Sequence, residues 1–282
     1  MKPLNDTTFA VNTVGNTQAL LLCLSSVINA TQVPRKIRIR SEGHFPSTSG
    51  YYLEQLMEFA RWKGVETSIT VDKSKGVRYA RDWQIDNCTT RYLWMGDDDV
   101  VYHYECLENL YGAMMTIHPK ARDEVAYLCG SKADLNNRRN YPNWNTSLQG
   151  ADKVKEDCPF FYSYDVQACA GKIAKMSTMD TGNCFLNIPL LRKHGIRFTL
   201  YDDSVNCGGE DTLFAMECAN LKLQAYFVPS AQSYHLEKEN LNFSEFAARA
   251  EMILRVAHER KYPAEVVNKV KAAHAAWGFS QK

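Results

Sequence analysis

Apolar and polar positions follow two alternating rhythms through the first hundred residues. Short apolar runs predict strands near residues 9–12, 37–41, 65–71 and 92–95. Between these runs, apolar residues at helical spacing predict helices near 20–28, 52–59 and 77–85. A regular strand–helix alternation favours a mostly parallel central sheet flanked by helices, an α/β fold.

The pattern changes in the second half of the chain. We expect one α/β domain over 1–240, interrupted by an irregular insertion at 131–176, and a helical C-terminal extension at 241–282. The elements expected around the insertion are a helix at 107–117, a strand at 125–129, a turn at 180–183, an apolar stretch and helix through 191, a helix from 210 to about 221, and a strand at 223–228 that Pro229 stops.

Composition narrows the class of protein. The 282 residues are 45% hydrophobic with a formal net charge of +1, so bulk charge points to neither nucleic acid nor membrane. No apolar run is long enough to span a bilayer, and the N-terminus lacks the apolar core of a signal peptide. The nine cysteines are scattered without a CxxC pair, which favours reduced thiols and a cytoplasmic location.

The strongest chemical signal is the run Asp97-Asp98-Asp99, which directly follows a buried strand. Ligands bind parallel sheets beyond the carboxyl ends of their strands, where Thr13 and Glu42 would also lie. Alternation along a strand would turn Asp97 and Asp99 one way and Asp98 the other. A divalent cation with oxygen ligands, which usually also holds substrate phosphates, is the natural partner of such acids. The alternative is a solvated acidic turn.

A second cluster is Gly208-Gly209-Glu210-Asp211. The glycines allow the backbone to approach a ligand closely, and both acids fall in the first turn of a predicted helix, where the helix dipole favours negative charge. A plain helix start without catalytic role is the alternative. In the insertion, Arg138-Arg139 and several aromatic residues suit contacts with phosphates, sugars or bases, or else form an ordinary packed core.

These features occur in a familiar order: the segment 75–82 with its two arginines, the three aspartates, the GGED run and a later His235. The set resembles the family 2 glycosyltransferases and their relatives with the GT-A fold, over roughly residues 8–236. The resemblance implies a metal-dependent transfer from a nucleotide sugar, with Mn²⁺ or Mg²⁺ as cofactor. Its metal ligands would be Asp99, Asp97 and His235.

The resemblance also implies how the donor is bound, with a UDP-sugar favoured. Two positions depart from the family pattern: Ser41-Glu42 stands where two aspartates are usual, and Asp82 replaces the usual asparagine after the second arginine. The residues expected to contact the nucleotide, its phosphates or the metal are Thr13, Glu42, Arg78, Arg81, Asp97 and Asp98.

Transfer to a hydroxyl also needs a base. Asp211 matches the base of inverting relatives, the helix dipole is expected to keep it ionised, and Glu210 would then bind sugar hydroxyls. The two roles can be exchanged, and an enzyme that retains configuration needs neither as a base.

Two other classes of function stay open at this stage. A nucleotidyltransferase can share a similar sheet and a metal held by carboxylates, but residues 13–16 match its glycine-rich phosphate loop poorly. A non-enzymatic module that binds sugar or nucleic acid would not need this set of acids. The acceptor is a glycan, a lipid-linked glycan, a protein, a small molecule or a hydroxylated DNA base, and the insertion at 131–176 would face it. The C-terminal helices are a candidate contact between copies of the chain.

Overall fold

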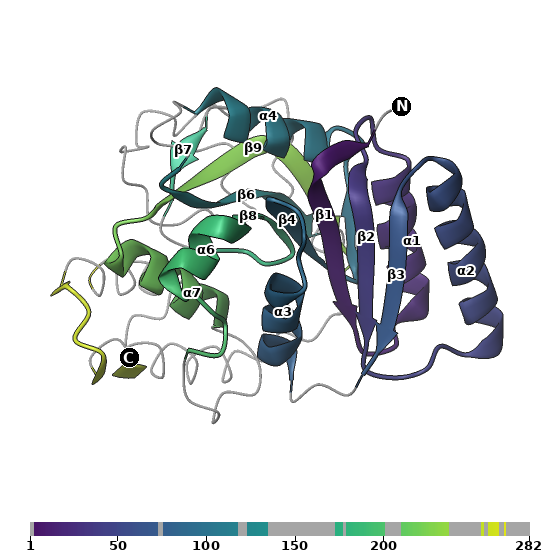
Figure 1. The fold of residues 1–282 in the computed structure, drawn as a ribbon, viewed down its shortest axis with the longest axis horizontal. Helices are drawn as coiled ribbons and strands as arrows, with labels where there is room; N and C mark the ends of the chain where they lie inside the picture. Colours follow the sequence, from purple (N-terminus) through teal and green to yellow (C-terminus); the bar gives the residue numbers. More distant parts are fainter. Residues whose placement is uncertain are drawn as a thin grey trace.

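A computed structural model gives the fold of the chain. It describes residues 3–72, 76–117, 123–134, 173–176, 179–200, 210–236, 255–256, 259–264 and 268. Its centre is one twisted sheet with helices on both faces (Figure 1). In the described residues the strands follow the order β3-β2-β1-β4-β8-β6-β9-β5, and β7 pairs with β9.

Half of the sheet is parallel. It consists of β1 (Leu4–Thr13), β2 (Pro34–Ser41), β3 (Glu66–Val71) and β4 (Tyr92–Asp97). The carboxyl ends of these four strands therefore meet at one edge. The other half is mixed: β8 (Asn183–Asn187) runs antiparallel to β4 and to β6 (Val125–Asp134), whereas β6 is parallel to β9 (Gln224–His235). The short strands β5 (Val100–Tyr102) and β7 (Ala174–Lys175) run antiparallel to β9.

The two faces of the sheet are covered by different helices. Alternation sends Phe9 and Trp94 into one core and Ala10 and Met95 into the other. The first core includes α1 (Thr17–Ile28), α2 (Ser47–Trp62) and α4 (Cys106–Thr116), and the second includes α3 (Val77–Asp86), α6 (Ile188–His194) and α7 (Glu210–Asn220).

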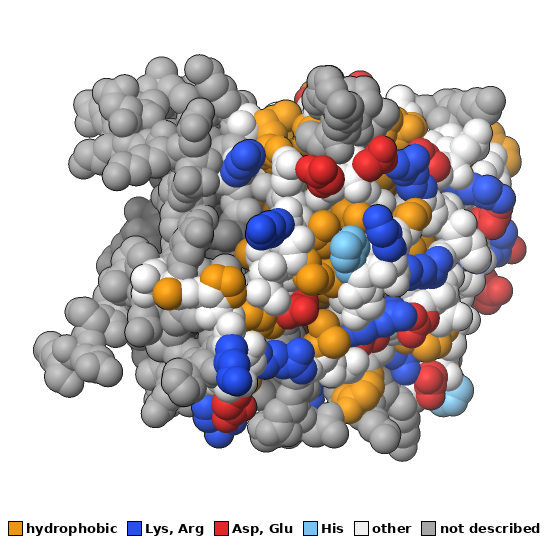
Figure 2. Space-filling model, turned by 60° about the vertical axis from the view of Figure 1, so that its left-hand side comes forward, with side chains coloured by type: hydrophobic (Ala, Val, Ile, Leu, Met, Phe, Trp, Pro, Cys, Tyr) orange, Lys and Arg blue, Asp and Glu red, His pale blue; other side chains and the backbone are white. Residues whose placement is uncertain are grey.

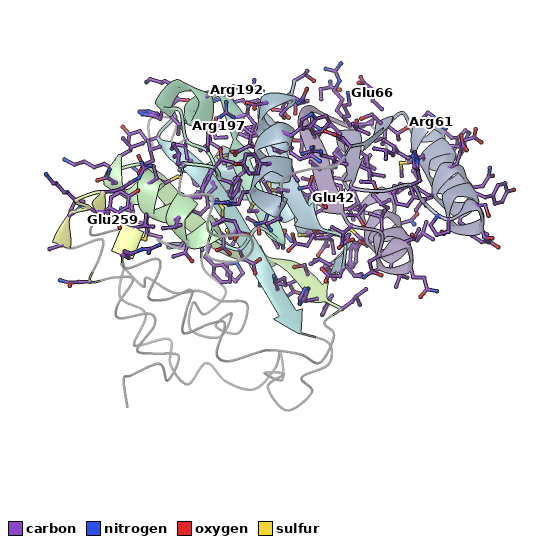
Figure 3. All side chains as sticks on the ribbon, turned by 90° about the horizontal axis from the view of Figure 1, so that it is seen from below. Glu42, Arg61, Glu66, Arg192, Arg197 and Glu259 are labelled. Carbon is purple, nitrogen blue, oxygen red and sulfur yellow. The ribbon has the colours of Figure 1, made fainter. Side chains whose placement is uncertain are left out.

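Two arginines on and after α6 fix the end of α3. Arg192 donates to the backbone oxygens of residues 85, 86 and 88 at 2.7–2.9 Å, and Arg197 pairs with Asp86 at 2.6 Å. Both arginines lie together beside α6 in Figure 3. Because a helix C-terminus carries partial negative charge, these cations stabilise α3 and hold the helix that carries Arg78 and Arg81.

The predicted fold class is confirmed, and the predicted elements match except in three places. The short strands β5 and β7 escaped detection. Pro229 does not stop the last strand: the β6–β9 ladder skips residues 229–231 and resumes, so β9 reaches His235. Proline lacks the amide hydrogen that a ladder needs, and it is tolerated at such an irregularity.

Most of the predicted insertion and extension lies outside the described residues. Of 131–176, the structure describes the end of β6 and the segment 173–176, and of 241–282 only short pieces. In one of these pieces, the hydroxyl of Tyr262 donates to Glu217 on α7 and Arg260 donates to the carbonyl of Leu200. No helix in the described part of the chain is long and apolar enough to cross a membrane.

Candidate active site

The carboxyl edge of the parallel strands brings together the first three predicted residues. The Thr13 hydroxyl donates to Asp98 Oδ2 at 2.5 Å, and the Glu42 amide donates to the Thr13 carbonyl at 3.0 Å. Burial and the neighbouring Asp99 and Asp97 raise the pKa of Asp98 to about 6, although the Thr13 hydrogen bond works against this shift. Asp98 thus turns toward Thr13 and away from the rest of the acidic cluster.

Asp97 faces a deeply buried arginine. Arg81 on α3 lies 3.3 Å from Asp97 Oδ1, and its guanidinium also pairs with Glu210 in the first turn of α7. Both Arg81 and Glu210 are 6% exposed. Burial opposes the charge of Arg81, but Glu210 and Asp97 outweigh it and raise its pKa above the usual value. One side chain therefore connects the acidic strand end to the helix that carries the second acidic pair.

Asp99 meets His235, the last residue of β9. Their Oδ1 and Nε2 atoms are 3.3 Å apart. The contact follows from strand pairing, because Val100 on β5 lies opposite His235 and the Leu236 amide donates to the Asp99 carbonyl at 2.8 Å. Burial would raise the pKa of Asp99, but the hydrogen bond and charge of His235, together with Lys132, lower it.

The candidate base behaves differently from expectation. Asp211 lies beside Glu210 at the start of α7 and accepts from the Thr212 amide at 2.7 Å. The helix dipole was expected to keep this acid ionised, but burial and the charge of Glu210 raise its pKa to about 7, against the opposing effect of Arg81. The shift runs opposite to the effect expected of the helix dipole, because desolvation outweighs a helix terminus. A group that titrates near neutrality is still well matched to general base catalysis.

The other two residues of the α3 motif are also buried. Arg78 is 4% exposed, and its guanidinium lies 5.9 Å from the ring centre of Tyr79. Asp82 accepts hydrogen bonds from the Phe198 and Thr199 amides at 2.7 and 3.0 Å, and from the Thr199 hydroxyl at 2.5 Å. Asp82 therefore anchors the segment after α6. This is the structural role of the aspartate that stands here in place of the usual asparagine.

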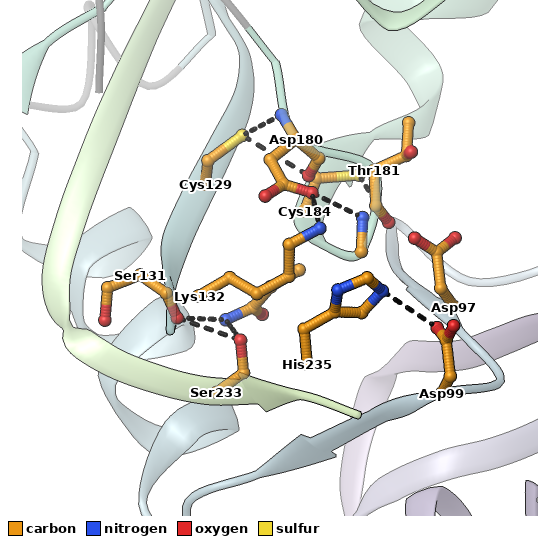
Figure 4. A network of polar contacts seen from close by, with 12 residues as sticks. Asp97, Asp99, Cys129, Ser131, Lys132, Asp180, Thr181, Cys184, Ser233 and His235 are labelled. Carbon is orange, nitrogen blue, oxygen red and sulfur yellow. Dashed lines mark hydrogen bonds and ion pairs between the residues drawn. The ribbon is translucent and has the colours of Figure 1, made fainter. Parts of the chain in front are cut away.

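Sequence reasoning missed a second, partly buried ion pair beside the acidic cluster. Lys132 Nζ on β6 lies 2.8 Å from Asp180 Oδ1, in the turn that precedes β8 (Figure 4). Asp180 together with Asp97 and Asp99 raises the pKa of Lys132, although burial opposes it. Only tertiary packing brings these two residues together, and no motif in the sequence marks them.

Glycines and a tyrosine shape the floor of this site. A Cβ at Gly96 would lie 1.9 Å from the Tyr102 hydroxyl, so only glycine leaves room for that ring under the strand end. The Tyr102 hydroxyl donates to the carbonyl of Gly182 at 2.7 Å. Strand β5 is thereby tied to the Gly182 turn, which faces Asp97 and Lys132.

Two of the predicted metal ligands meet at the edge of the sheet. Asp99 and His235 offer an oxygen and a nitrogen at one point, and Asp97 lies beside them (Figure 4). Within the residues that the structure describes, no group of three His, Cys, Asp or Glu side chains could hold a metal ion by itself. An open site of this kind suits a cation that keeps positions for phosphate oxygens.

Known proteins provide an independent comparison. No family model and no curated protein sequence matches the chain. Among solved structures, the mannosyltransferase PcManGT from Pyrobaculum calidifontis, in complex with GDP-Man and Mn²⁺, aligns with a TM-score of 0.61 at 11% identity, over 98% of this chain and 76% of that one.

Two further structures agree with it. TarS 1-349 from S. aureus aligns with a TM-score of 0.59 at 16% identity, over 98% of this chain and 75% of that one. GalNAc-T7 with UDP, GalNAc and Mn²⁺ aligns with a TM-score of 0.56 at 14% identity, over 84% of this chain and 45% of that one. At these identities the likeness concerns the fold alone, and it confirms the GT-A glycosyltransferase fold that the sequence predicted.

Proposed function

We propose that this protein is a metal-dependent glycosyltransferase, which moves a sugar from a nucleotide sugar to a hydroxyl acceptor with inversion of configuration. The observation that carries the proposal is the contact between Asp99 and His235 at 3.3 Å, at the carboxyl edge of a GT-A sheet. The neighbouring acids Glu210 and Asp211 supply a candidate base in the same site. The neighbours solved with GDP-Man, UDP and Mn²⁺ support a nucleotide-sugar donor.

Asp99 and His235, with Asp97 beside them, would hold Mn²⁺ or Mg²⁺. When bound, such a cation stabilises the negative charge of the departing diphosphate. The pKa of Asp99 is lowered in the metal-free protein, so this carboxylate is ionised and ready to bind a cation at neutral pH. The imidazole supplies a nitrogen ligand in its neutral form.

Thr13 and Glu42 are the proposed contacts of the nucleoside, because they close the carboxyl ends of β1 and β2. Asp98 would orient Thr13 through their hydrogen bond. Arg78 and Arg81 remain the proposed phosphate contacts, since a guanidinium suits phosphate geometry. Arg81 already has two carboxylate partners, and a phosphate would have to share it with them.

Asp211 is the proposed base, which removes the proton of the acceptor hydroxyl as the oxygen attacks the sugar, and Glu210 is its proposed supporting acid. We keep a glycan, a small molecule and a hydroxylated DNA base as acceptors. On the face drawn in Figure 2, basic and acidic side chains are interspersed with apolar ones. This mixture lends no support to a nucleic acid over a glycan, since nucleic-acid binding depends on clustered positive charge.

Calorimetric titration of UDP, GDP and dTDP, with and without Mn²⁺, tests the proposal. We expect one of these nucleotides to bind in a Mn²⁺-dependent manner, and Asp99→Ala to abolish that dependence. The fold should survive, because the Asp99 side chain is 32% exposed and an ion pair as exposed as the one with His235 contributes little to stability. Exposed Glu58→Ala on α2 is the matched control. Metal-dependent binding that persists undiminished in Asp99→Ala would remove Asp99 from the metal site.

A further inference from the structure

The partly buried pair of Lys132 and Asp180 has no role in the function proposed so far. Their side chains are 17% and 16% exposed, and they come from β6 and from the turn before β8. Burying two charged groups is costly, and replacement of such a pair by apolar residues is often neutral or stabilising. A pair at this place therefore calls for a functional explanation.

The position of the pair is defined by Gly182. A Cβ built on Gly182 would lie 2.9 Å from Asp97 Oδ2 and 2.9 Å from Lys132 Nζ. The ammonium thus faces the acid cluster across Gly182, where even a methyl group would collide with both side chains.

The pair therefore lies beside Asp97, which Arg81 connects to Glu210 in the first turn of α7. Asp97 and Asp99 mark the side of the diphosphate, and Asp211 marks the side of the acceptor. In a nucleotide sugar, the transferred sugar is the group that joins these two sides. Residues beside Asp97, with hydrogen-bonding groups to spare, are in position to contact that sugar.

Both members of the pair have such groups. Asp180 Oδ1 accepts from Lys132 and from the Gly182 amide at 2.8 and 2.9 Å. Among the described residues, the side-chain hydrogen bonds of Asp180 fall on Oδ1 and leave Oδ2 available, and Lys132 uses one of the three donors of its ammonium. A free acceptor beside free donors matches two adjacent sugar hydroxyls, each of which can both donate and accept.

We infer that Lys132 and Asp180 bind adjacent hydroxyl groups of the donor sugar and thereby select it. The inference rests on the proposed function and deepens it, because it names the part of the donor that this pair recognises. The sugar it fits carries two free neighbouring hydroxyls. A change in the pair should lower kcat/KM for the nucleotide sugar, whereas the affinity for the bare nucleoside diphosphate should stay the same.

The test compares each nucleotide with its sugar derivative. UDP and UDP-glucose, GDP and GDP-mannose, and dTDP and dTDP-glucose are titrated with Mn²⁺, and donor hydrolysis is followed in parallel. The variant is the double change Lys132→Met/Asp180→Asn, which leaves no unpaired buried charge. Lys193→Met, on the exposed side of α6, is the matched control.

We expect the variant to bind the nucleoside diphosphate within about threefold of the native protein. Its kcat/KM for hydrolysis of the sugar derivative should fall on the order of tenfold to a hundredfold, the range for lost hydrogen bonds to charged groups. Gly182→Ala is a second probe, because its methyl group would collide with Lys132 Nζ and displace it, and it should also lower kcat/KM for hydrolysis of the sugar derivative.

The outcomes separate the two claims. If the variant loses the same factor in affinity for UDP and for UDP-glucose, the pair contacts the diphosphate and the sugar assignment is overturned. Unchanged hydrolysis in both the double variant and Gly182→Ala would overturn it as well. A native protein that binds none of the six nucleotides would instead refute the proposed function, and the sugar assignment with it.

Discussion

Loss of the Arg81 guanidinium should destabilise this protein more than any other single change to an ion pair discussed above. In Arg81→Met the side-chain length is kept, but Glu210 loses its partner and Asp97 loses a contact at 3.3 Å. Glu210 is 6% exposed, and its Oε2 atom already lacks a hydrogen-bond partner in the described residues. The change therefore leaves a buried carboxylate with no compensation.

The expected cost is about 3–5 kcal/mol of the free energy of unfolding, the usual result of breaking a buried pair from one side. Glu210→Gln should cost less, because Arg81 keeps Asp97 as a partner. The double variant Arg81→Met/Glu210→Gln should be more stable than the sum of the single losses, because it removes both buried charges together.

Urea unfolding followed by circular dichroism measures these values, with EDTA present to exclude metal. The matched control is Arg35→Met, which breaks an exposed pair with Glu66 at 3.1 Å and should cost at most about 1 kcal/mol. A loss below about 1 kcal/mol for Arg81→Met, or strictly additive single changes, would show that the buried bridge does not hold α3 and α7 together.

Two further predictions concern pH. Because the pKa of Asp211 is raised to about 7, kcat/KM should fall as the pH drops below about 7. The variant Asp211→Asn should lose a hundredfold to ten-thousandfold in kcat with near-native donor affinity. Near-native turnover of this variant, or a product whose anomeric configuration is retained by NMR, would exclude Asp211 as the base. The pKa of folded Asp98 is about 6, against an ordinary 3.8, so the folded state holds the proton more tightly and its stability should fall as the pH rises from about 4 to about 6. Asp98→Asn keeps an acceptor for Thr13 and should stabilise the metal-free protein by about 1 kcal/mol at pH 7. Urea unfolding midpoints of the native protein and the variant at pH 4.5 and 7 measure this. If the midpoint changes between the two pH values by the same amount in both proteins, the raised pKa of Asp98 is contradicted.

Much of the fold could be predicted because strand and helix periods are local properties of the chain. The parallel strands ending in Thr13 and Asp97 are apolar and bounded by polar residues, and their parallel direction follows from the strand–helix alternation. The strand β5 has only three residues, too few for a period to appear. The extension of β9 beyond Pro229 depends on pairing with β6, which no local pattern records.

In the candidate site, too, local motifs could be predicted from the sequence and long-range contacts could not. Asp99, Asp211 and His235 lie in motifs, so their neighbourhood could be anticipated from the order of the motifs. The partnership of Arg81 with Glu210 joins residues far apart in the sequence, and so does that of Lys132 with Asp180. The ionisation of Asp98 and Asp211 could not be predicted from the sequence either, because the pKa of a carboxylate depends on how deeply packing buries it.

The pairing of β5 with β9 makes this protein sensitive to changes of chain length. Asp99 meets His235 only because Val100 stands opposite His235, and a shift of register by one residue would turn that imidazole to the other side of the sheet. Residues 229–231, which the β6–β9 ladder skips, can absorb an insertion without moving that register. Natural length variation along β9 would therefore gather at this irregularity, and the stretch from Gln232 to His235 would keep its length.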